Sequence, residues 1–381
     1  MKTLIKNGIV ILDGIKRINN GAVMIEAGKI TGIYQDYEKL EADNVVDAHN
    51  NYIIPGLIDS HSHGAMGYDF NKCSNQELEI ISDRLLDEGV TGFNASLVCE
   101  SHLDTLALLK KYADHTPDNL IGVHLEGPYL NVLNKGVMKE EHLRLANFDE
   151  FNQYITTCKK VNAMTIAPEL PGALELINYG NNQGIVMNLG HSSATASEVL
   201  QAQAYGARGI THLYNAMSQH LHRDPGVVTG AIISKLMCEL IVDGFHIHED
   251  VINATYKAIG KERIILISDA NPCKGLPDGQ YRFSGKDIVI DGGHATVKQT
   301  GRIAGSTLGL NEACAKMMRY CGCSIDDAVL MAACNPAKLY GLKQGQIEIG
   351  YRGNIIVVDK AFNVLAVVNQ GVVKRNKINN C

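Results

Sequence analysis

Short apolar runs recur eight times between residues 57 and 267, and amphipathic stretches lie between most of them. The runs are Leu57–Asp59, Gly92–Ala95, Leu120–Leu125, Ala163–Ala167, Ile185–Leu189, Gly209–Thr211, Leu240–Val242 and Ile264–Ile267. Such runs suit buried strands, and the stretches Asn75–Glu88, Ser197–Tyr205 and Glu249–Ile259 have helical periodicity. Strand–helix alternation predicts parallel βα units, and eight of these suit a closed (β/α)8 TIM-like barrel. An open doubly wound sheet is the alternative, but no GxGxxG sequence follows any run.

Both ends of the chain differ from this middle, because they consist of strand-like runs separated by Gly and Asn. Near the beginning the runs are Leu4–Leu12, Gly21–Glu26 and Lys29–Ile33. Near the end they are Gly345–Ile349, Asn354–Asp359, Val364–Asn369 and Val372–Arg375. We therefore predict a small β-sandwich domain built from residues 1–54 and 345–381, and a barrel domain over residues 55–344.

The charge and hydropathy of the chain bear on its partners. The formal net charge of −6 argues against nucleic acid, which needs a strongly basic surface, but allows a small anionic substrate. No apolar run approaches the ~18 residues that cross a bilayer. Residues 1–14 lack a signal-peptide pattern, and none of the ten cysteines forms a CxxC pair. We therefore expect a cytoplasmic protein with free thiols and with no membrane or nucleic-acid partner.

Polar residues follow most of the predicted strands at the point where each strand ends. They are His61 and His63 after the first strand, Glu126 after the third, His191 after the fifth, His212 after the sixth, His246 after the seventh and Asp269 after the eighth. Barrel enzymes carry their catalytic groups at the carboxyl ends of the strands. We therefore expect these side chains to meet at one mouth of the barrel.

The pair His61 and His63 has the spacing of two metal ligands on one extended segment. Side chains at positions i and i+2 of a strand point to the same face, so two imidazoles there can bind one ion. A lone His-x-His pair is weak evidence, because two surface or hydrogen-bonded histidines would give the same pattern. Four of these histidines (His61, His63, His191 and His212) together with the two carboxylates, however, suit one or two divalent ions such as zinc or iron.

A metal site of this kind predicts a hydrolase. A bound divalent ion lowers the pKa of water from about 15.7 toward ~7 and polarises a carbonyl group. A neighbouring carboxylate can take a proton from that water and pass it to a leaving amine. Asp269 has the position for this role, although an Asp at a strand end can also cap the following helix.

Several motifs surround these residues, and they follow one another in a fixed order. They are PGLIDSHSH at 55–63, HLEGP at 124–128, GHSSA at 190–194, THLYNAM at 211–217, DGFH at 243–246, SDA at 268–270, AGSTL at 304–308 and NPA at 335–337. Together they resemble the N-acetylglucosamine-6-phosphate deacetylases of the amidohydrolase superfamily. The resemblance covers nearly the whole chain and implies a (β/α)8 barrel with a small β-sandwich domain from both termini.

The resemblance also implies a metal-ligand set. Glu126, His191 and His212 would hold the main catalytic ion, and His61 and His63 would add a second ion that Glu126 bridges. Some members of the family lack the His-x-His pair and use one ion, whereas this chain retains it. One or two divalent ions per subunit are therefore expected.

The implied reaction is hydrolysis of N-acetyl-D-glucosamine 6-phosphate to D-glucosamine 6-phosphate and acetate by a metal-activated water. Asp269 would act as general base and then as general acid, and His246 would hydrogen-bond the acetyl carbonyl and its developing oxyanion. Asn215 and Ala216 would bind the phosphate, partly through backbone N–H groups. Arg223 would reach the phosphate from the second subunit of a homodimer.

Residues 135–138, KGVM, depart from the family pattern. The family commonly has a His that touches the sugar where this chain has Met138, and a thioether is only a weak acceptor. N-acetylgalactosamine 6-phosphate therefore stays open as the substrate. Ser306 lies in a turn that the family places near the substrate, and no GxSxG sequence marks it as a nucleophile. Two further alternatives are an amidohydrolase acting on another amide and a non-catalytic sugar-phosphate-binding protein.

Overall fold

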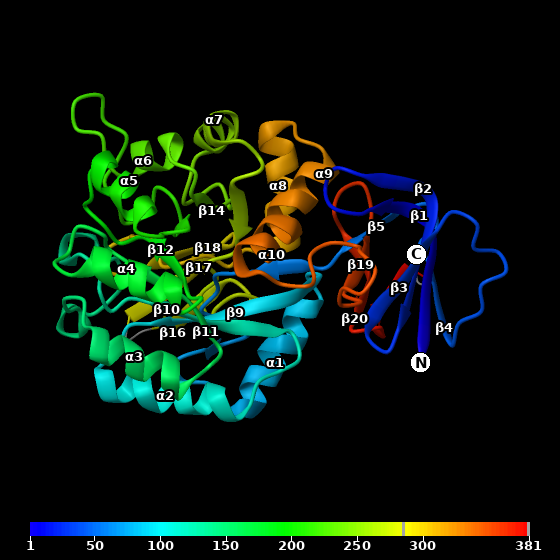
Figure 1. Cartoon of the computed structure of the whole chain (residues 1–381), viewed down its shortest axis with the longest axis horizontal. Coiled ribbons are helices and arrows are strands. Elements are labelled where there is room, and N and C mark those ends of the chain that lie inside the picture. The colour runs from blue at the N-terminus through cyan, green and yellow to red at the C-terminus, as the bar shows by residue number, and fades with distance from the viewer. Residues whose placement is uncertain (284–285, 379–381) are drawn as a thin grey trace. The chain divides into compact units, whose positions relative to one another are not determined.

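The structure, a computed structural model, describes residues 1–283 and 286–378. It divides into two compact units (Figure 1). The first unit comprises Met1–Asp59, Ser82–Gly92 and Gly309–Cys381, and the second comprises Ser60–Ile81 and Phe93–Leu308. The domain limits expected from the sequence, 1–54 with 345–381 and 55–344, stay a prediction.

Strands from both ends of the chain form one eight-stranded sheet in the first unit. Its order is β21-β20-β19-β5-β1-β2-β3, and β4 pairs with β1. The strands are β1 (Lys2–Ile11), β2 (Arg17–Glu26), β3 (Lys29–Tyr34), β4 (Asn44–Asp47), β5 (Tyr52–Pro55), β19 (Ile355–Val358), β20 (Val364–Asn369) and β21 (Val372–Asn376). Buried side chains of β1 to β5, β19 and β20 pack into one apolar cluster, so the two ends share a core. The predicted β-rich domain built from both termini is therefore confirmed.

Residues 345–349 are not the strand that the sequence suggested. Gly345 has a φ of 76°, and a Cβ atom there would lie 2.4 Å from the carbonyl oxygen of Ala333. Ile347 still reaches the core, and its backbone N–H donates to the carbonyl of Leu12. The prediction was wrong because Gly345, which was expected to begin a strand, forms a turn instead.

Eight strands form the second sheet, in the order β15-β14-β13-β12-β11-β10-β9-β6, with parallel pairing from β9 to β15. They are β6 (Leu57–Asp59), β9 (Val90–Val98), β10 (Leu120–Glu126), β11 (Val161–Ile166), β12 (Val186–Leu189), β13 (Gly209–Ile210), β14 (Met237–Ile241) and β15 (Ile264–Ile267). Just beyond β6 and β15, the N–H of Asp269 donates to the carbonyl of His61 and the N–H of His63 to that of Ala270. These bonds join the two edges, and the predicted (β/α)8 barrel is confirmed.

Helices alternate with these strands, and Figure 1 shows α2 to α7 outside them. The helices are α1 (Asn75–Leu86), α2 (His102–Asp114), α3 (Phe148–Thr157), α4 (Ala173–Asn182), α5 (Ala196–Ala204), α6 (Val227–Ile233), α7 (Glu249–Ile259), α8 (Leu310–Cys321), α9 (Ile325–Val329), the π-helix η3 (Leu330–Cys334) and α10 (Asn335–Tyr340). Local sequence sets their limits: α5 starts at a capping box of Thr195 and Glu198, and α7 ends at Gly260. Within the described residues, no helix combines the length and apolar character that a membrane span requires.

Loops after the strands carry small elements that the sequence reading did not predict. They are the pair β7 (Gly64–Ala65) and β8 (Tyr68–Asp69), the 3₁₀ turns η1 (Val132–Asn134) and η2 (Glu140–His142), and a three-stranded sheet of β16 (Gly279–Phe283), β17 (Lys286–Asp291) and β18 (His294–Val297). All of them belong to the second unit, which also holds every predicted site residue. The segments after the strands therefore build the site.

Candidate metal centre and active site

The turns that follow the barrel strands hold several predicted site residues in an unusual backbone conformation. His191, His212 and Asp269 have φ values of 49°, 31° and 44°. This left-handed region is sparsely populated by residues other than glycine and persists only where the surroundings enforce it. At Asp269 the enforcing contact is the backbone hydrogen bond to the carbonyl of His61, 2.9 Å long. Side chains from distant parts of the sequence are thereby brought together.

Glu126, His191 and His212 converge, and we call them the first cluster. One carboxylate oxygen of Glu126 lies 3.2 Å from Nε2 of His191 and 3.2 Å from Nε2 of His212. The two Nε2 atoms lie 3.0 Å apart. Nδ1 of His191 lies 2.7 Å from the carbonyl of Asn134, which only accepts, so this nitrogen donates its proton. Nε2 of His191 therefore presents a lone pair to the cluster.

His61, His63 and Asp269 form the second cluster. Nε2 of His63 lies 3.3 Å from Nε2 of His61 and 3.3 Å from a carboxylate oxygen of Asp269. Nδ1 of His63 donates to the carbonyl of Ser96 at 3.0 Å. Glu126 belongs to both clusters, because its oxygens lie 3.5 Å from Nε2 of His61 and 3.4 Å from Nε2 of His63.

Glu239 contacts the second cluster, although the sequence analysis did not select it. One of its carboxylate oxygens lies 3.0 Å from Nδ1 of His61, and the other accepts a hydrogen bond from the Ser60 hydroxyl at 3.2 Å. Glu239 lies inside β14, where the neighbouring residues are apolar. An acidic residue within an apolar strand was the signal that could have identified it, because such a group is rarely buried without a partner.

The donor chemistry of the two clusters fits divalent metal ions. In His61, His63 and His191 the Nδ1 atom meets an oxygen acceptor, which leaves the Nε2 lone pair free. These lone pairs face carboxylate oxygens, and opposed lone pairs repel unless a cation or a proton lies between them. Imidazole nitrogens with carboxylate oxygens are a common ligand set of zinc and iron.

The electrostatics of the two clusters agree with this reading. Burial would raise the pKa of Glu126, but hydrogen bonds from His191, His212 and His61 hold it well below its usual value. Burial also acts to raise the pKa of Asp269, but His61 and His63 bring it down to about 2. Burial lowers the pKa of His61, whereas Asp269, Glu126 and Glu239 together raise it well above 6.5. The raised pKa of His61 favours a proton at the position in the second cluster that a cation would otherwise occupy.

His246 lies next to the clusters and has a fixed orientation. Its Nδ1 lies 2.6 Å from one carboxylate oxygen of Asp243, and the other oxygen accepts from the backbone N–H groups of Phe245 and His246. Burial lowers the pKa of His246, but the hydrogen bond and charge of Asp243 outweigh it and raise the pKa. His246 can therefore carry a second proton on Nε2, which makes this atom a hydrogen-bond donor.

A cavity of about 210 Å³ joins these groups in the second unit. Its wall contains His63, Glu126, His191, His212, His246 and Asp269, together with Asn215 and Ala216. An apolar part of the wall consists of Val98, Val137, Met138, Ile303 and Ala304. The cavity thus combines residues from both clusters of candidate metal ligands with a hydrogen-bond donor and an apolar surface.

The remaining predicted site residues take different places. Met138 is 5% exposed and lines the cavity. Ser306 is buried, does not line the cavity, and donates its hydroxyl to the carbonyl of Ser268. Arg223 is exposed and does not line the cavity of its own chain. The substrate contacts expected of these residues stay predictions.

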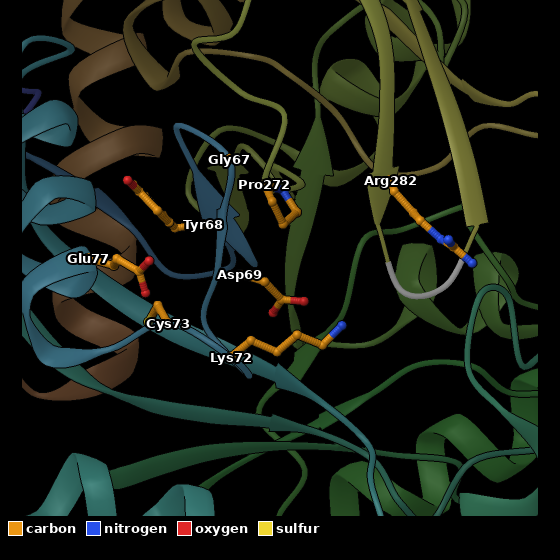
Figure 2. Close-up of a pocket in the computed structure, with 8 residues that line it drawn as sticks. All are labelled: Gly67, Tyr68, Asp69, Lys72, Cys73, Glu77, Pro272 and Arg282. Carbon is orange, nitrogen blue, oxygen red and sulfur yellow. The ribbon is translucent and has the colours of Figure 1, made fainter.

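A second hollow, of about 240 Å³, lies beside β7 and β8. Asp69, Lys72 and Arg282 of β16 are among the lining residues that Figure 2 shows. Neither cluster contributes a residue to its lining. Its size is comparable with that of the first cavity, so chemistry rather than volume identifies the candidate active site.

Comparison with known proteins identifies the family of this chain. The sequence model of the amidohydrolase family matches residues 52–374. The chain belongs to the amidohydrolase family. The resemblance seen in the spaced motifs and the expected hydrolase class are thereby confirmed.

Relatives of this amidohydrolase include named deacetylases. It is 31% identical to the N-acetylglucosamine-6-phosphate deacetylase of Bacillus subtilis, over 97% of this chain and 96% of the relative. It is also 31% identical to the N-acetylgalactosamine-6-phosphate deacetylase of Escherichia coli O157:H7, over 86% of this chain and 89% of the relative. Among solved structures, a mutant N-acetyl-D-glucosamine-6-phosphate deacetylase of Mycobacterium smegmatis in complex with N-acetyl-D-glucosamine-6-phosphate superposes with a TM-score of 0.92. That match has 29% sequence identity and covers 98% of this chain and 99% of the other.

Proposed function

We propose that this amidohydrolase removes the acetyl group from N-acetyl-D-glucosamine 6-phosphate and releases D-glucosamine 6-phosphate and acetate. The observation that carries the proposal is that Glu126 takes part in two ligand clusters on the wall of one cavity, together with Asp269 and His246. The deacetylases of Bacillus subtilis and Mycobacterium smegmatis, similar over nearly the whole chain, support the choice of substrate.

The residues of the two clusters would hold the metal. Glu126, His191 and His212 would bind one ion, and His61 and His63 would bind a second with Glu126 between the two. A bound divalent ion acidifies water and polarises a carbonyl group. Zinc and iron both suit nitrogen and carboxylate ligands, and we propose one of these as the native metal.

Asp269 would move the proton during hydrolysis. With a pKa of about 2 its carboxylate is ionised at neutral pH, so it can accept a proton from the attacking water as the new C–O bond forms. The same proton would then pass to the amide nitrogen as the C–N bond breaks. The products are a free amine and acetate, so one water molecule is consumed.

His246 would stabilise the negative charge that develops on the acetyl oxygen. Asp243 holds its ring through Nδ1 and favours the protonated form, so Nε2–H is available as a donor. A donor that is fixed before the reaction lowers the barrier, because it need not reorganise as charge develops. This role requires the acetyl oxygen to lie within hydrogen-bond distance of Nε2.

We further propose that the sugar phosphate lies against Asn215 and Ala216, which line the cavity. Arg223 is exposed on the loop before α6, and we propose that it reaches the phosphate of a second subunit in a homodimer. A cytoplasmic location is proposed because the nine cysteines of the described residues are free thiols, which suits a reducing compartment.

An acetate-release assay tests the proposal directly. The assay would compare N-acetylglucosamine 6-phosphate, its galactosamine epimer and unphosphorylated N-acetylglucosamine, with elemental analysis of the same protein sample. We expect metal-dependent acetate release that is fastest with the first compound and is lost after chelation. Release of acetate from none of the three by metal-loaded protein would contradict the proposal.

Deacetylation of N-acetylgalactosamine 6-phosphate is the second candidate. Met138, rather than a residue with a strong hydrogen-bonding group, forms part of the cavity wall, and the Escherichia coli relative bears the name of that activity. A kcat/KM that is higher for the galactosamine epimer would favour this candidate over the first.

A further inference from the structure

Glu239 is a buried acidic residue to which the proposed reaction gives no role. It is 2% exposed and lies in β14 between Cys238 and Leu240, both fully buried. Removing a carboxylate from water is costly unless it is paired and hydrogen-bonded. The carboxylate of Glu239 contacts the segment after β6: the Ser60 hydroxyl donates to one oxygen, and Nδ1 of His61 lies 3.0 Å from the other.

These contacts fix the roles of the two nitrogens of the His61 ring. The Ser60 hydroxyl donates to one oxygen of Glu239, and Nδ1 of His61 lies 3.0 Å from the other. When Nδ1 donates its proton to Glu239, Nε2 carries the lone pair. Nε2 is also the atom that lies 3.3 Å from Nε2 of His63 and 3.5 Å from Glu126. The tautomer that Glu239 favours is the one that can bind an ion within the second cluster.

His61 differs in this respect from His63 and His191. Nδ1 of His63 donates to the Ser96 carbonyl and Nδ1 of His191 to the Asn134 carbonyl, both of which are backbone groups. A carboxylate partner makes an imidazole a stronger metal ligand than a neutral carbonyl does. Of these three histidines, only His61, in the second cluster, has a carboxylate as the partner of its Nδ1 atom.

We infer that Glu239 is a positioning residue for the second metal ion. It holds His61 in the Nδ1–H form, aims Nε2 at the second cluster and strengthens that ligand. The inference rests on the proposed metal-dependent function and deepens it, because it assigns the affinity of the second ion to one side chain. Loss of such a partner lowers metal affinity by about 10- to 100-fold.

The test measures zinc binding to the full chain after removal of metal by chelation. Equilibrium dialysis with elemental analysis would give the number of ions and both dissociation constants for the wild type and Glu239→Gln. We expect two ions in the wild type, and in the variant a first ion of unchanged affinity and a second ion bound about 10- to 100-fold more weakly. Glu198→Gln, which changes a half-buried glutamate of the capping box that starts α5, is the matched control and should leave both constants unchanged.

A double-mutant cycle separates positioning from a general structural effect. His61→Asn should remove the second ion, and adding Glu239→Gln should then change nothing more in the affinity of the first. The inference is overturned if the wild type binds one ion, if Glu239→Gln changes the second constant less than threefold, or if the double variant also weakens the first ion.

A measurement on the wild type covers the case in which Glu239→Gln does not fold. Nitrogen-15 NMR of histidine-labelled protein should show a proton on Nδ1 of His61, in a signal that His61→Asn removes. A proton on Nε2 with Nδ1 bare in the zinc-loaded protein would overturn the inference. Acetate release is measured separately: a protein that binds two ions as expected but releases no acetate would refute the proposed function and leave the role of Glu239 intact.

Discussion

Replacing Asp269 with Asn isolates the proton-transfer step of the proposed reaction. The change keeps the size of the side chain but removes the charge and the ability to accept a proton. Burial acts to raise the pKa of Asp269, but the neighbouring histidines lower it below its ordinary value, so the native side chain is a carboxylate at pH 7. The wild type therefore has the base fully available, and the variant loses all of it.

The expected magnitude follows from the two roles of this side chain. General acid–base catalysis contributes about 10²- to 10⁴-fold to a rate, and Asp269 would serve both proton transfers. We expect Asp269→Asn to lower kcat by about 10³- to 10⁴-fold, which corresponds to about 4 to 5 kcal/mol. The assay is steady-state acetate release at saturating substrate, with the metal content of the same sample determined.

Metal content decides how a loss of activity is interpreted, because Asp269 lies 3.3 Å from Nε2 of His63. An inactive variant with a full complement of metal supports the proton-transfer role, whereas an inactive variant that has lost an ion would identify Asp269 as a ligand instead. Asp104→Asn, at an exposed position near the start of α2, is the matched control and should keep wild-type kcat. Turnover within tenfold of wild type in Asp269→Asn would refute the assignment.

Three further changes test other parts of the site. Burial lowers the pKa of His246, but Asp243 raises it above the ordinary 6.5, so the Nε2 proton is lost only at higher pH. In a pH–rate profile, kcat should therefore fall on the alkaline side as this proton is lost. Asp243→Asn should move this fall in kcat to lower pH. Glu126→Gln removes the charge that both clusters share, so we expect less than one ion per chain after dialysis, and two retained ions would contradict its bridging role. Met138→His adds a polar group to the apolar wall and should shift the ratio of kcat/KM for the two epimers about 3- to 10-fold toward the glucosamine substrate. An unchanged ratio would show that this position does not distinguish the two sugars.

Much of the barrel could be predicted because its strands are short, buried on both faces and followed by polar residues. The predicted limits match those of strand β15 (Ile264–Ile267) and helix α7 (Glu249–Ile259). The four consecutive apolar residues of β15 indicate a buried strand. The strand expected at 345–349 failed because a glycine with positive φ turns the chain there. The sheet of β16 to β18 was missed, although the alternation in residues 286–291 and the pair Gly292–Gly293 are typical of a hairpin.

The sequence predicted which candidate ligand residues would come together, but not the residues that support them. Glu126 is the last residue of its strand and the four histidines follow shortly after theirs, so a barrel brings these five residues together whatever its details. The contact between His61 and Glu239, by contrast, joins residues 178 positions apart, and no local pattern encodes it. Contacts of this kind depend on strand register and on side-chain rotamers, which only the folded structure defines.

Anomalous X-ray diffraction from crystals grown with zinc tests the central claim most directly. We predict a peak about 2.0 to 2.2 Å from the ligand atoms of Glu126, His191 and His212, and a second peak beside His61 and His63. Data collected on both sides of the zinc absorption edge would identify the element. Crystals of zinc-loaded, active protein that show no peak between these side chains would contradict the account.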